Sequence, residues 1–228
     1  MDVSLLDGLA STRAIRRYTD EPVDEADLNR MLFAATRAPT GSNRQGFRFL
    51  VLRDGPAAAE AKSILGTSFR RGWLAKQAKD GYAEGSGGDE SSPKARMART
   101  MQHFVDNFER TPVVVLPCIR RRHDAFADGA SVYPACQNLL LSARALGYGG
   151  VLTMWHQQVE EDLRAVLAIP EDFAIAACIP IGRPAGRHGP VRRRPLAELV
   201  FDDRWDTPAP WAVDPDGTRF TSAGPPRR

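Results

Sequence analysis

The feature that most constrains the fold is a short, wholly apolar run at residues 112–117, with the sequence Pro-Val-Val-Val-Leu-Pro. A run of this kind is typical of a strand that is buried on both faces. Residues 47–52, 150–155 and 173–181 are also short and rich in apolar side chains, and we expect strands there too. The run therefore predicts a central sheet that is covered on both sides.

Helical patterns separate these strands. Apolar stripes and capping residues predict helices over residues 3–10, 22–37, 57–78, 94–108, 130–146 and 159–167. The helix over 3–10 has Leu5, Leu6 and Leu9 on one face, and Gly147 is expected to end the helix over 130–146. Strands separated by helices favour a mixed α/β or α+β sheet sandwiched by helices.

The composition is that of an ordinary globular protein, since 43% of the 228 residues are hydrophobic and 26% are charged. We expect one domain over residues 1–200 and an extension over 201–228, rich in Pro, Asp and Trp, that wraps a surface or a partner subunit. No apolar run approaches the roughly 20 residues that span a bilayer, and the first residues lack the pattern of a secretion signal. A cytoplasmic location is therefore expected.

The net charge of +3 raises the question of nucleic-acid binding. Basic clusters at residues 120–122 and 192–194 would be the groups that neutralise phosphates. However, acidic residues balance the basic ones almost one for one, and the chain carries no zinc-finger spacing or aromatic-basic RNA motif. We expect no nucleic-acid or membrane partner, and a basic anion-binding or RNA-binding protein stays the non-enzymatic alternative.

Three short segments have the chemistry of a site for an anionic, hydrogen-bonding cofactor. Residues 11–18 (Ser-Thr-Arg-Ala-Ile-Arg-Arg-Tyr) and 192–194 supply guanidiniums that can clamp a phosphate through paired, charge-assisted bonds. Residues 38–45 (Ala-Pro-Thr-Gly-Ser-Asn-Arg-Gln) supply hydroxyl and amide side chains that can read the edge of a polar heterocycle. Taken alone, each segment also fits solvated charges or ordinary turn chemistry. Their combination favours a cofactor site.

With these segments the chain resembles the FMN-dependent nitroreductase family over residues 9 to 199. Family members carry an R-R-S-x-R-like segment, a P-S-x-x-N-x-Q-like loop and a late basic patch before a P-L-x-E-like tail. The resemblance implies an α+β fold with a mixed or antiparallel central sheet flanked by helices. It also implies an intertwined homodimer with two FMN sites at the interface, each built from both chains.

The resemblance also implies a set of FMN-binding residues. They are Arg13, Ala14, Arg16, Pro39, Thr40, Ser42, Asn43, Gln45, Thr153, Met154, Trp155, Arg192, Arg193 and Arg194. Arg13 and Arg16 would hold the ribityl phosphate and the pyrimidine edge, and the late arginines would close on the phosphate. Thr12 and Ala14 depart from the family pattern, where an Arg and a Ser are more usual, so the contact left at Ala14 is its backbone N–H.

By the same resemblance, the loop at 39–45 would touch the ribityl chain or the ring. Residues 153–155 would lie against the ring face and N5, although apolar residues at a strand end are usually core.

Residues 79–93 are rich in Gly, Asp, Glu and Ser and predict a mobile loop. In position it resembles the variable insertion that covers the substrate in this family, and a plain surface excursion is the alternative. If it folds over the flavin, four side chains can stack on a planar substrate: Trp73, Tyr82, Met101 and Phe104.

The resemblance implies an oxidoreductase in which flavin carries the chemistry. Hydride would pass from NAD(P)H through flavin N5 to an electron-poor acceptor of the nitroaromatic or quinone type, in a ping-pong cycle. No side-chain acid or base is required, so no catalytic residue is expected. The enzymatic alternatives are another specialised flavin enzyme or a reductive dehalogenase, for which Tyr82, Glu84 and Lys94 lie in the lid-like region. The choice between NADH, NADPH and a deazaflavin donor stays open.

The histidines and cysteines do not predict a metal site or a disulfide framework. The histidines are His103, His123, His156 and His188, scattered along the chain. The cysteines, Cys118, Cys136 and Cys178, stand in apolar surroundings without C-x-x-C spacing and are expected to be buried.

Overall fold

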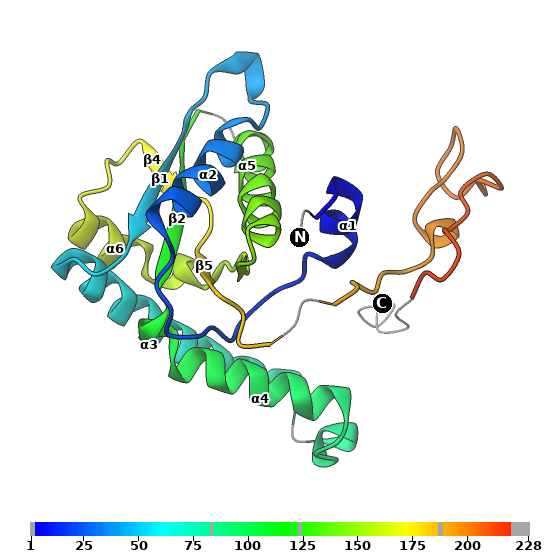
Figure 1. Cartoon of the computed structure of the whole chain (residues 1–228), viewed down its shortest axis with the longest axis horizontal. Helices are drawn as coiled ribbons and strands as arrows, with labels where there is room; N and C mark the ends of the chain where they lie inside the picture. The colour runs from blue at the N-terminus through cyan, green and yellow to red at the C-terminus, as the bar shows by residue number, and fades with distance from the viewer. Residues whose placement is uncertain (1–2, 83, 123–124, 187–188, 220–228) are drawn as a thin grey trace.

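The computed structural model describes residues 3–82, 84–122, 125–186 and 189–219, and Figure 1 shows their arrangement. The helices are α1 (Leu5–Ser11), α2 (Glu25–Thr36), α3 (Pro56–Lys79), α4 (Pro93–Asp106), α5 (Ala125–Ala145) and α6 (Glu160–Leu167). The strands are β1 (Phe47–Leu52), β2 (Val113–Arg120), β3 (Gly149–Gly150), β4 (Phe173–Ile175) and β5 (Ile179–Gly182). Single 3₁₀ turns lie at η1 (Gly41–Asn43), η2 (Gly85–Gly88), η3 (Phe108–Arg110), η4 (Trp155–Val159) and η5 (Leu196–Glu198).

The apolar run is the central strand, as predicted, and it continues beyond residue 117 to Arg120. β2 pairs with β1 on one side and with β4 and β5 on the other, and β3 pairs with β5; every pair among the described strands is antiparallel. Alternate side chains of β2 enter two different cores. Val113 and Val115 face α2 and α5, whereas Val114 and Leu116 face α3, α4 and α6. Burial on both faces explains why the strand has no polar side chain before its last residue.

The predicted strand over 173–181 is split into β4 and β5. Val115 pairs with Ile179 and Cys118 pairs with Ile175, so two residues of β2 face the three residues 176–178. This extra residue is a β-bulge. It lies opposite Pro117, which has no backbone N–H to donate to a continuous ladder.

The prediction of a strand over residues 150–155 was wrong for most of that range. Within the described residues, its ladder pairing is confined to β3 and to an isolated bridge between Thr153 and Cys178. The chain then turns into η4 at Trp155. Val151 is buried, and Leu152, Met154 and Trp155 are partly buried against the two cores. Periodicity alone does not distinguish this packing from strand pairing.

The helices confirm the predictions, with shifted ends. α5 begins at Ala125 rather than at residue 130, and Gly147 follows it with the positive φ of 83° that a C-terminal cap requires. α2 begins after Asp24, whose carboxylate accepts hydrogen bonds from the N–H groups of Ala26 and Asp27.

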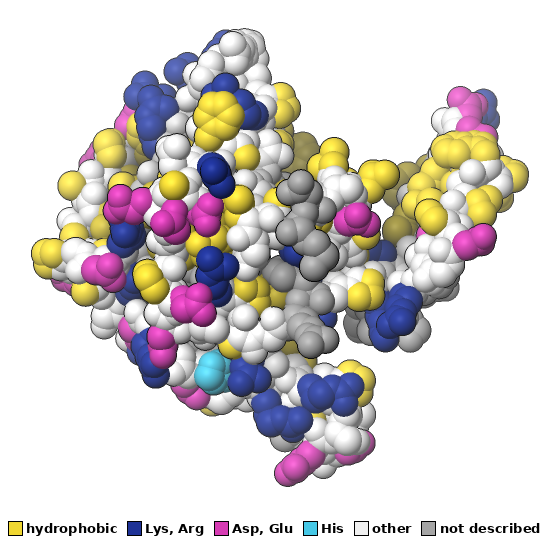
Figure 2. Space-filling model, viewed as in Figure 1, with side chains coloured by type: hydrophobic (Ala, Val, Ile, Leu, Met, Phe, Trp, Pro, Cys, Tyr) yellow, Lys and Arg dark blue, Asp and Glu magenta, His cyan; other side chains and the backbone are white. Residues whose placement is uncertain are grey.

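Among the described residues, α1 and the segment after residue 195 both expose several apolar side chains. On α1 the exposed fractions are 70% for Leu5 and 75% for Leu6. The segment after residue 195 projects from the body as an arm that displays apolar side chains, among them Trp205 and Trp211 at 83% and 67% exposure (Figures 1 and 2). Residues 220–228 of the expected extension lie outside the described residues.

Among the helices that the structure describes, none combines the length and apolarity needed to cross a membrane.

Candidate functional site

A cavity of about 410 Å³ lies where α3, α4 and the segment after β3 meet. It is lined by Arg16, Trp73, Lys76, Tyr82, Met97, Met101, Phe104, Val151, Leu152, Thr153, Met154 and Trp155. The structure thus brings together one predicted arginine, the whole predicted strand end at 153–155 and all four predicted substrate-stacking side chains. Sequence reasoning missed Lys76, Met97, Val151 and Leu152; of these, Val151 and Leu152 continue the predicted strand end.

Trp155 is held in place by α3. Ser68, which is 1% exposed, donates its hydroxyl to the Trp155 carbonyl at 3.0 Å. The indole lies across Gly72, where an added Cβ would be 3.6 Å from Trp155 Cδ2, and it meets the Phe69 ring edge-on at 5.4 Å between centroids. One wall of the cavity is therefore a fixed aromatic ring.

The backbone before Trp155 is equally constrained. Thr153 exchanges two hydrogen bonds with Cys178, at 3.0 Å and 2.9 Å, and His156 Nε2 lies 2.9 Å from the carbonyl oxygen of Ile175. His156 is fully buried, and this burial lowers its pKa from the ordinary value, so the imidazole is neutral near pH 7. The segment is thus tied to the bulge between β4 and β5.

Arg16 reaches the cavity from an extended segment that lies along β3. Ile15 donates its N–H to the Gly150 carbonyl at 3.0 Å, and the Tyr18 hydroxyl donates to the Ile15 carbonyl at 2.6 Å. The Arg16 side chain is half-buried, and burial lowers its pKa, yet an arginine stays charged at neutral pH. A cation is therefore present at the edge of an otherwise largely apolar cavity.

The structure also brings the early and late basic segments side by side. Val191 donates its N–H to the Ala10 carbonyl at 2.9 Å, and the guanidinium of Arg13 lies 3.8 Å from the position that a Cβ at Gly189 would occupy. Arg192 and Arg193 are exposed, as are Ala14 and Arg194. Arg194 differs from its neighbours because its Nε lies 2.7 Å from Glu198, which offsets its charge.

The loop at 38–45 is not brought to the cavity of its own chain. It lies against the first half of α5, where Gly41 donates its N–H to Ser131 Oγ at 3.2 Å, and Figure 1 shows the α2–β1 connection far from α4. Within the described residues, none of the five predicted members of this loop lines the cavity. These members are Pro39, Thr40, Ser42, Asn43 and Gln45.

The same loop has an unusual backbone. Ser42, Asn43 and Gln45 all have positive φ, at 52°, 50° and 49°. Thr40 Oγ1 accepts the N–H of Gln45 at 3.0 Å, which closes the turn. Left-handed backbone at three non-glycine residues is costly, and such strain concentrates at functional sites.

The lid-like segment is folded onto the edge of the cavity. Tyr82 packs edge-on against Trp73, with 5.0 Å between ring centroids. Lys94 Nζ donates to the Gly81 carbonyl at 2.6 Å and lies 3.4 Å from the Glu84 carbonyl oxygen. The Lys94 ammonium, which the dehalogenase alternative needs for substrate, is thus used to hold the loop.

The predicted stacking residues are also core residues. Trp73, Met101 and Phe104 are 1%, 8% and 4% exposed, and all three belong to the core between the sheet, α3 and α4. Tyr82 is half-buried and lies at the cavity edge.

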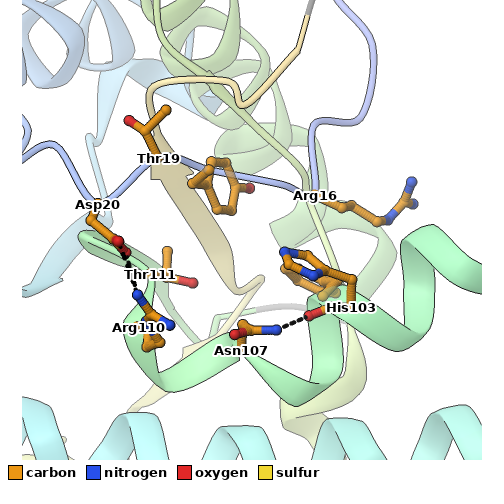
Figure 3. Close-up of a pocket in the computed structure, with 9 residues that line it drawn as sticks. Arg16, Thr19, Asp20, His103, Asn107, Arg110 and Thr111 are labelled. Carbon is orange, nitrogen blue, oxygen red and sulfur yellow. Dashed lines mark hydrogen bonds and ion pairs between the residues drawn. The ribbon is translucent and has the colours of Figure 1, made fainter.

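A second pocket, of about 200 Å³, adjoins the cavity and shares Arg16 and Phe104 with it. Figure 3 shows the residues that line this second pocket. It lies between the chain at residues 16–20 and the end of α4 with η3. Its lining is more polar and includes Asp20, His103 and Arg110. Arg110 Nη2 donates to both carboxylate oxygens of Asp20, at 2.9 Å each.

The cysteines and the histidines do not form a metal site or a disulfide within the described residues. Burial raises the pKa of Cys118 to about 11 and that of Cys136 to about 12, and burial also raises the pKa of Cys178. All three cysteines are buried and free. His123 and His188 lie outside the described residues, and the described part contains no group of three His, Cys, Asp or Glu side chains that could hold a metal ion.

Comparison with known proteins shows which family this chain matches. The family model described as "Nitroreductase family" matches residues 9–183. A Thermus thermophilus protein named NADH dehydrogenase is 30% identical over 199 residues, 83% of this chain and 91% of that protein. A 5,6-dimethylbenzimidazole synthase of Rhodospirillum rubrum is 28% identical over 210 residues, 87% of this chain and 89% of that protein. A crystal structure from Desulfovibrio desulfuricans, of a nitroreductase-type protein in complex with FMN, is 27% identical, with a TM-score of 0.63 over 90% of this chain and 99% of that chain.

Proposed function

Because this chain belongs to the nitroreductase family, we propose that it is an NAD(P)H-dependent flavin oxidoreductase that reduces an electron-poor acceptor such as a nitroaromatic compound or a quinone. Family membership confirms the predicted α+β fold and the predicted class, an FMN-dependent oxidoreductase. The observation that carries the proposal is the cavity, which combines a charged guanidinium, the fixed backbone of residues 153–155 and an aromatic wall.

The residues present fit FMN by the chemistry of their donors and walls. A flavin ring needs a flat, largely apolar slot, and its phosphate needs several cations. Trp155, Met154 and Leu152 supply apolar walls, and Arg13 lies beside the segment that carries Arg192 and Arg193. When bound, FMN supplies the atom that accepts and returns a hydride.

The proposed roles of the protein groups follow from charge and position. Arg16 would stabilise negative charge at the pyrimidine edge of the reduced ring, because a preorganised cation in a partly apolar site is worth more than in water. Thr153 offers a hydroxyl and Trp155 a fixed wall for the ring. Arg13, Arg192 and Arg193 would bind the phosphate.

We propose that each site is completed by a second copy of the chain, in an intertwined homodimer. The strained loop at 38–45 carries side-chain amides, which the lining of the cavity lacks, and further hydroxyl groups, and it lies away from the cavity of its own chain. The exposed leucines of α1 and the projecting arm supply apolar surface for the interface. In this proposal residues 1–200 form the FMN-binding domain and 201–228 the extension.

The donor and the acceptor would use the same cavity in turn, which is the structural basis for a ping-pong cycle. Tyr82 and its loop would limit the access of water to that cavity. The proposed location is the cytoplasm, where free thiols such as the three buried cysteines are usual.

The test begins with the visible spectrum of the purified protein, followed by heating and chromatography of any released chromophore. The proposal expects yellow protein that releases about one FMN per chain, as for a resident flavin cofactor, and oxidises NADH or NADPH when a quinone or nitroaromatic acceptor is present. Arg13→Ala and Arg193→Ala should lose FMN while the circular dichroism spectrum is retained. Colourless protein that cannot be reconstituted with FMN would overturn the proposal and favour the anion-binding alternative.

A further inference from the structure

The smaller pocket beside the cavity has the character of a site for an anionic group. Its volume of about 200 Å³ is smaller than the roughly 300–1,000 Å³ of a pocket for a whole ligand, so it fits part of a molecule. Arg16, Arg110 and His103 line it, against a single carboxylate from Asp20. Thr19 and Asn107 add a hydroxyl and an amide. This lining suits phosphate oxygens, which accept hydrogen bonds from guanidinium, imidazole and hydroxyl groups.

The charges stand at both ends of the pocket. In Figure 3 the Arg16 side chain extends away from the Asp20–Arg110 pair. Arg110 uses Nη2 for Asp20, which leaves other N–H groups of the same guanidinium for a ligand. Both side chains of this pair are largely exposed, at 67% for Arg110 and 77% for Asp20, and exposed ion pairs contribute little stability and rearrange easily.

The pocket and the cavity are neighbours, because Arg16 and Phe104 line both of them. A dinucleotide donor has one part for each site, because its planar dihydronicotinamide ring suits the cavity and its phosphates suit the smaller pocket. We propose that the smaller pocket binds the phosphate groups of this donor while the dihydronicotinamide ring occupies the cavity. This inference rests on the proposed function.

Phosphate oxygens in this pocket have a second conceivable source, the phosphate of FMN itself. The proposal commits to the donor because Arg13, Arg192 and Arg193 already provide a separate basic group for the flavin phosphate. The test therefore measures FMN retention together with donor binding.

The test compares Arg110→Gln, Asp20→Asn and a control, Arg30→Gln, in the FMN-loaded protein. Arg30 matches Arg110, since it is also 67% exposed and also paired with an aspartate, Asp27 at 3.5 Å, but it lies on α2. Calorimetry with ADP-ribose, which carries the donor phosphates without the nicotinamide, gives a readout that is independent of turnover. Loss of one charge-assisted bond predicts binding about tenfold weaker in Arg110→Gln. Asp20→Asn should bind about threefold tighter, because it removes the opposing charge, and Arg30→Gln should bind as the unaltered protein does.

Kinetics with a truncated donor separates this inference from the proposed function. Arg110→Gln should raise the KM for NADH or NADPH and leave kcat/KM for 1-benzyl-1,4-dihydronicotinamide, which has no phosphate, unchanged. Equal ADP-ribose affinity in all variants would overturn the inference, and so would loss of FMN from Arg110→Gln, which would assign the pocket to the flavin phosphate. If no dihydronicotinamide is oxidised, the proposed function fails, whereas Arg110-dependent binding of ADP-ribose would still support the subsite.

Discussion

At the scale of single residues, the candidate site depends on small side chains under a large one. The Trp155 ring packs on α3 at Gly72, and the Ser68 hydroxyl donates a hydrogen bond to the Trp155 carbonyl. Neither Ser68 nor Gly72 has a pattern that marks it in the sequence, because a helix surface that receives a ring from a distant segment looks like any small-residue position. The sequence predicted Trp155, and the structure adds what positions it.

Substitutions of increasing size at Gly72 test the contact between α3 and the Trp155 ring. Gly72→Ala places its Cβ at ordinary contact distance from Trp155 and should leave FMN binding unchanged, while helix propensity raises the free energy of unfolding by up to about 1 kcal/mol. Gly72→Leu should force the indole aside, weaken FMN binding and cost about 1–3 kcal/mol of stability through overpacking. FMN titration and urea unfolding measure both effects. Equal FMN affinity in the two variants would contradict the assigned role.

His156 predicts a dependence of stability on pH. Its pKa in the folded protein lies below the ordinary 6.5 because burial penalises the charged ring. As pH falls below 6.5, the unfolded chain takes up a proton that the folded protein does not. The free energy of unfolding therefore decreases with a slope approaching about 1.4 kcal/mol per pH unit, until the folded-state pKa is reached.

Urea unfolding between pH 7.5 and 5 measures this slope. His156→Gln should remove it relative to the unaltered protein, and His103→Gln, at an exposed position, should keep it. The same slope in the protein with and without His156 would show that other groups cause the acid sensitivity.

At the scale of elements, helix ends and strand breaks follow local chemistry that the sequence displays. Gly147 was identified as a cap and has the positive φ of one, and Pro117 lies where the ladder opposite it breaks into β4 and β5. The bulge itself was not predicted, because it depends on which strand faces Pro117. Pairing partners far apart in the chain are a property of the tertiary structure.

The start of α2 tests one of these local signals. Asp24→Ala removes an acceptor that satisfies two helix N–H groups and should lower the free energy of unfolding by about 0.5–2 kcal/mol. Glu25→Ala is the control, since its ion pair with Arg53 is exposed and should contribute less than about 1 kcal/mol. Thermal or urea unfolding gives both values, and an equal loss in the two variants would contradict the capping role.

At the scale of the whole molecule, the basic clusters at residues 120–122 and 192–194 are partly neutralised by carboxylates, although their composition suggests nucleic-acid binding. Arg120 pairs with Asp172 at 3.3 Å, Arg121 with Glu160 at 3.4 Å and Arg194 with Glu198. Carboxylates thus offset part of each cluster, which weakens the nucleic-acid alternative. Arg16, which lines the cavity, and Arg13, which lies beside the late basic segment, are two of the five arginines that the family resemblance implied.

The exposed apolar arm yields a prediction about assembly. The double substitution Trp205→Ser and Trp211→Ser should weaken the proposed homodimer, because these indoles are 83% and 67% exposed in the single chain and would be buried by a partner. Sedimentation equilibrium should show a dissociation constant raised at least about tenfold, with FMN lost on dilution.

The matched control for the arm is Leu74→Ser, which removes a side chain that is 69% exposed on α3. It should leave the dimer intact. A single-chain mass for the unaltered protein with a full complement of FMN would contradict the two-chain site.

The sequence by itself determined the central strand, most of the helices and several of the residues that line the cavity, because apolar periodicity, caps and basic segments are local properties of the chain. It also determined the family, through three ordered segments that no single residue would reveal. Only the tertiary structure decided that the chain leaves the sheet ladder after β3, that the loop at 38–45 lies away from the cavity of its own chain, and that Arg16 and Phe104 line two neighbouring pockets. These features depend on contacts between segments far apart in the chain, such as Gly41 with Ser131 and Ser68 with Trp155, which are 90 and 87 residues apart. The free energy of such contacts is not encoded in the pattern of either segment alone.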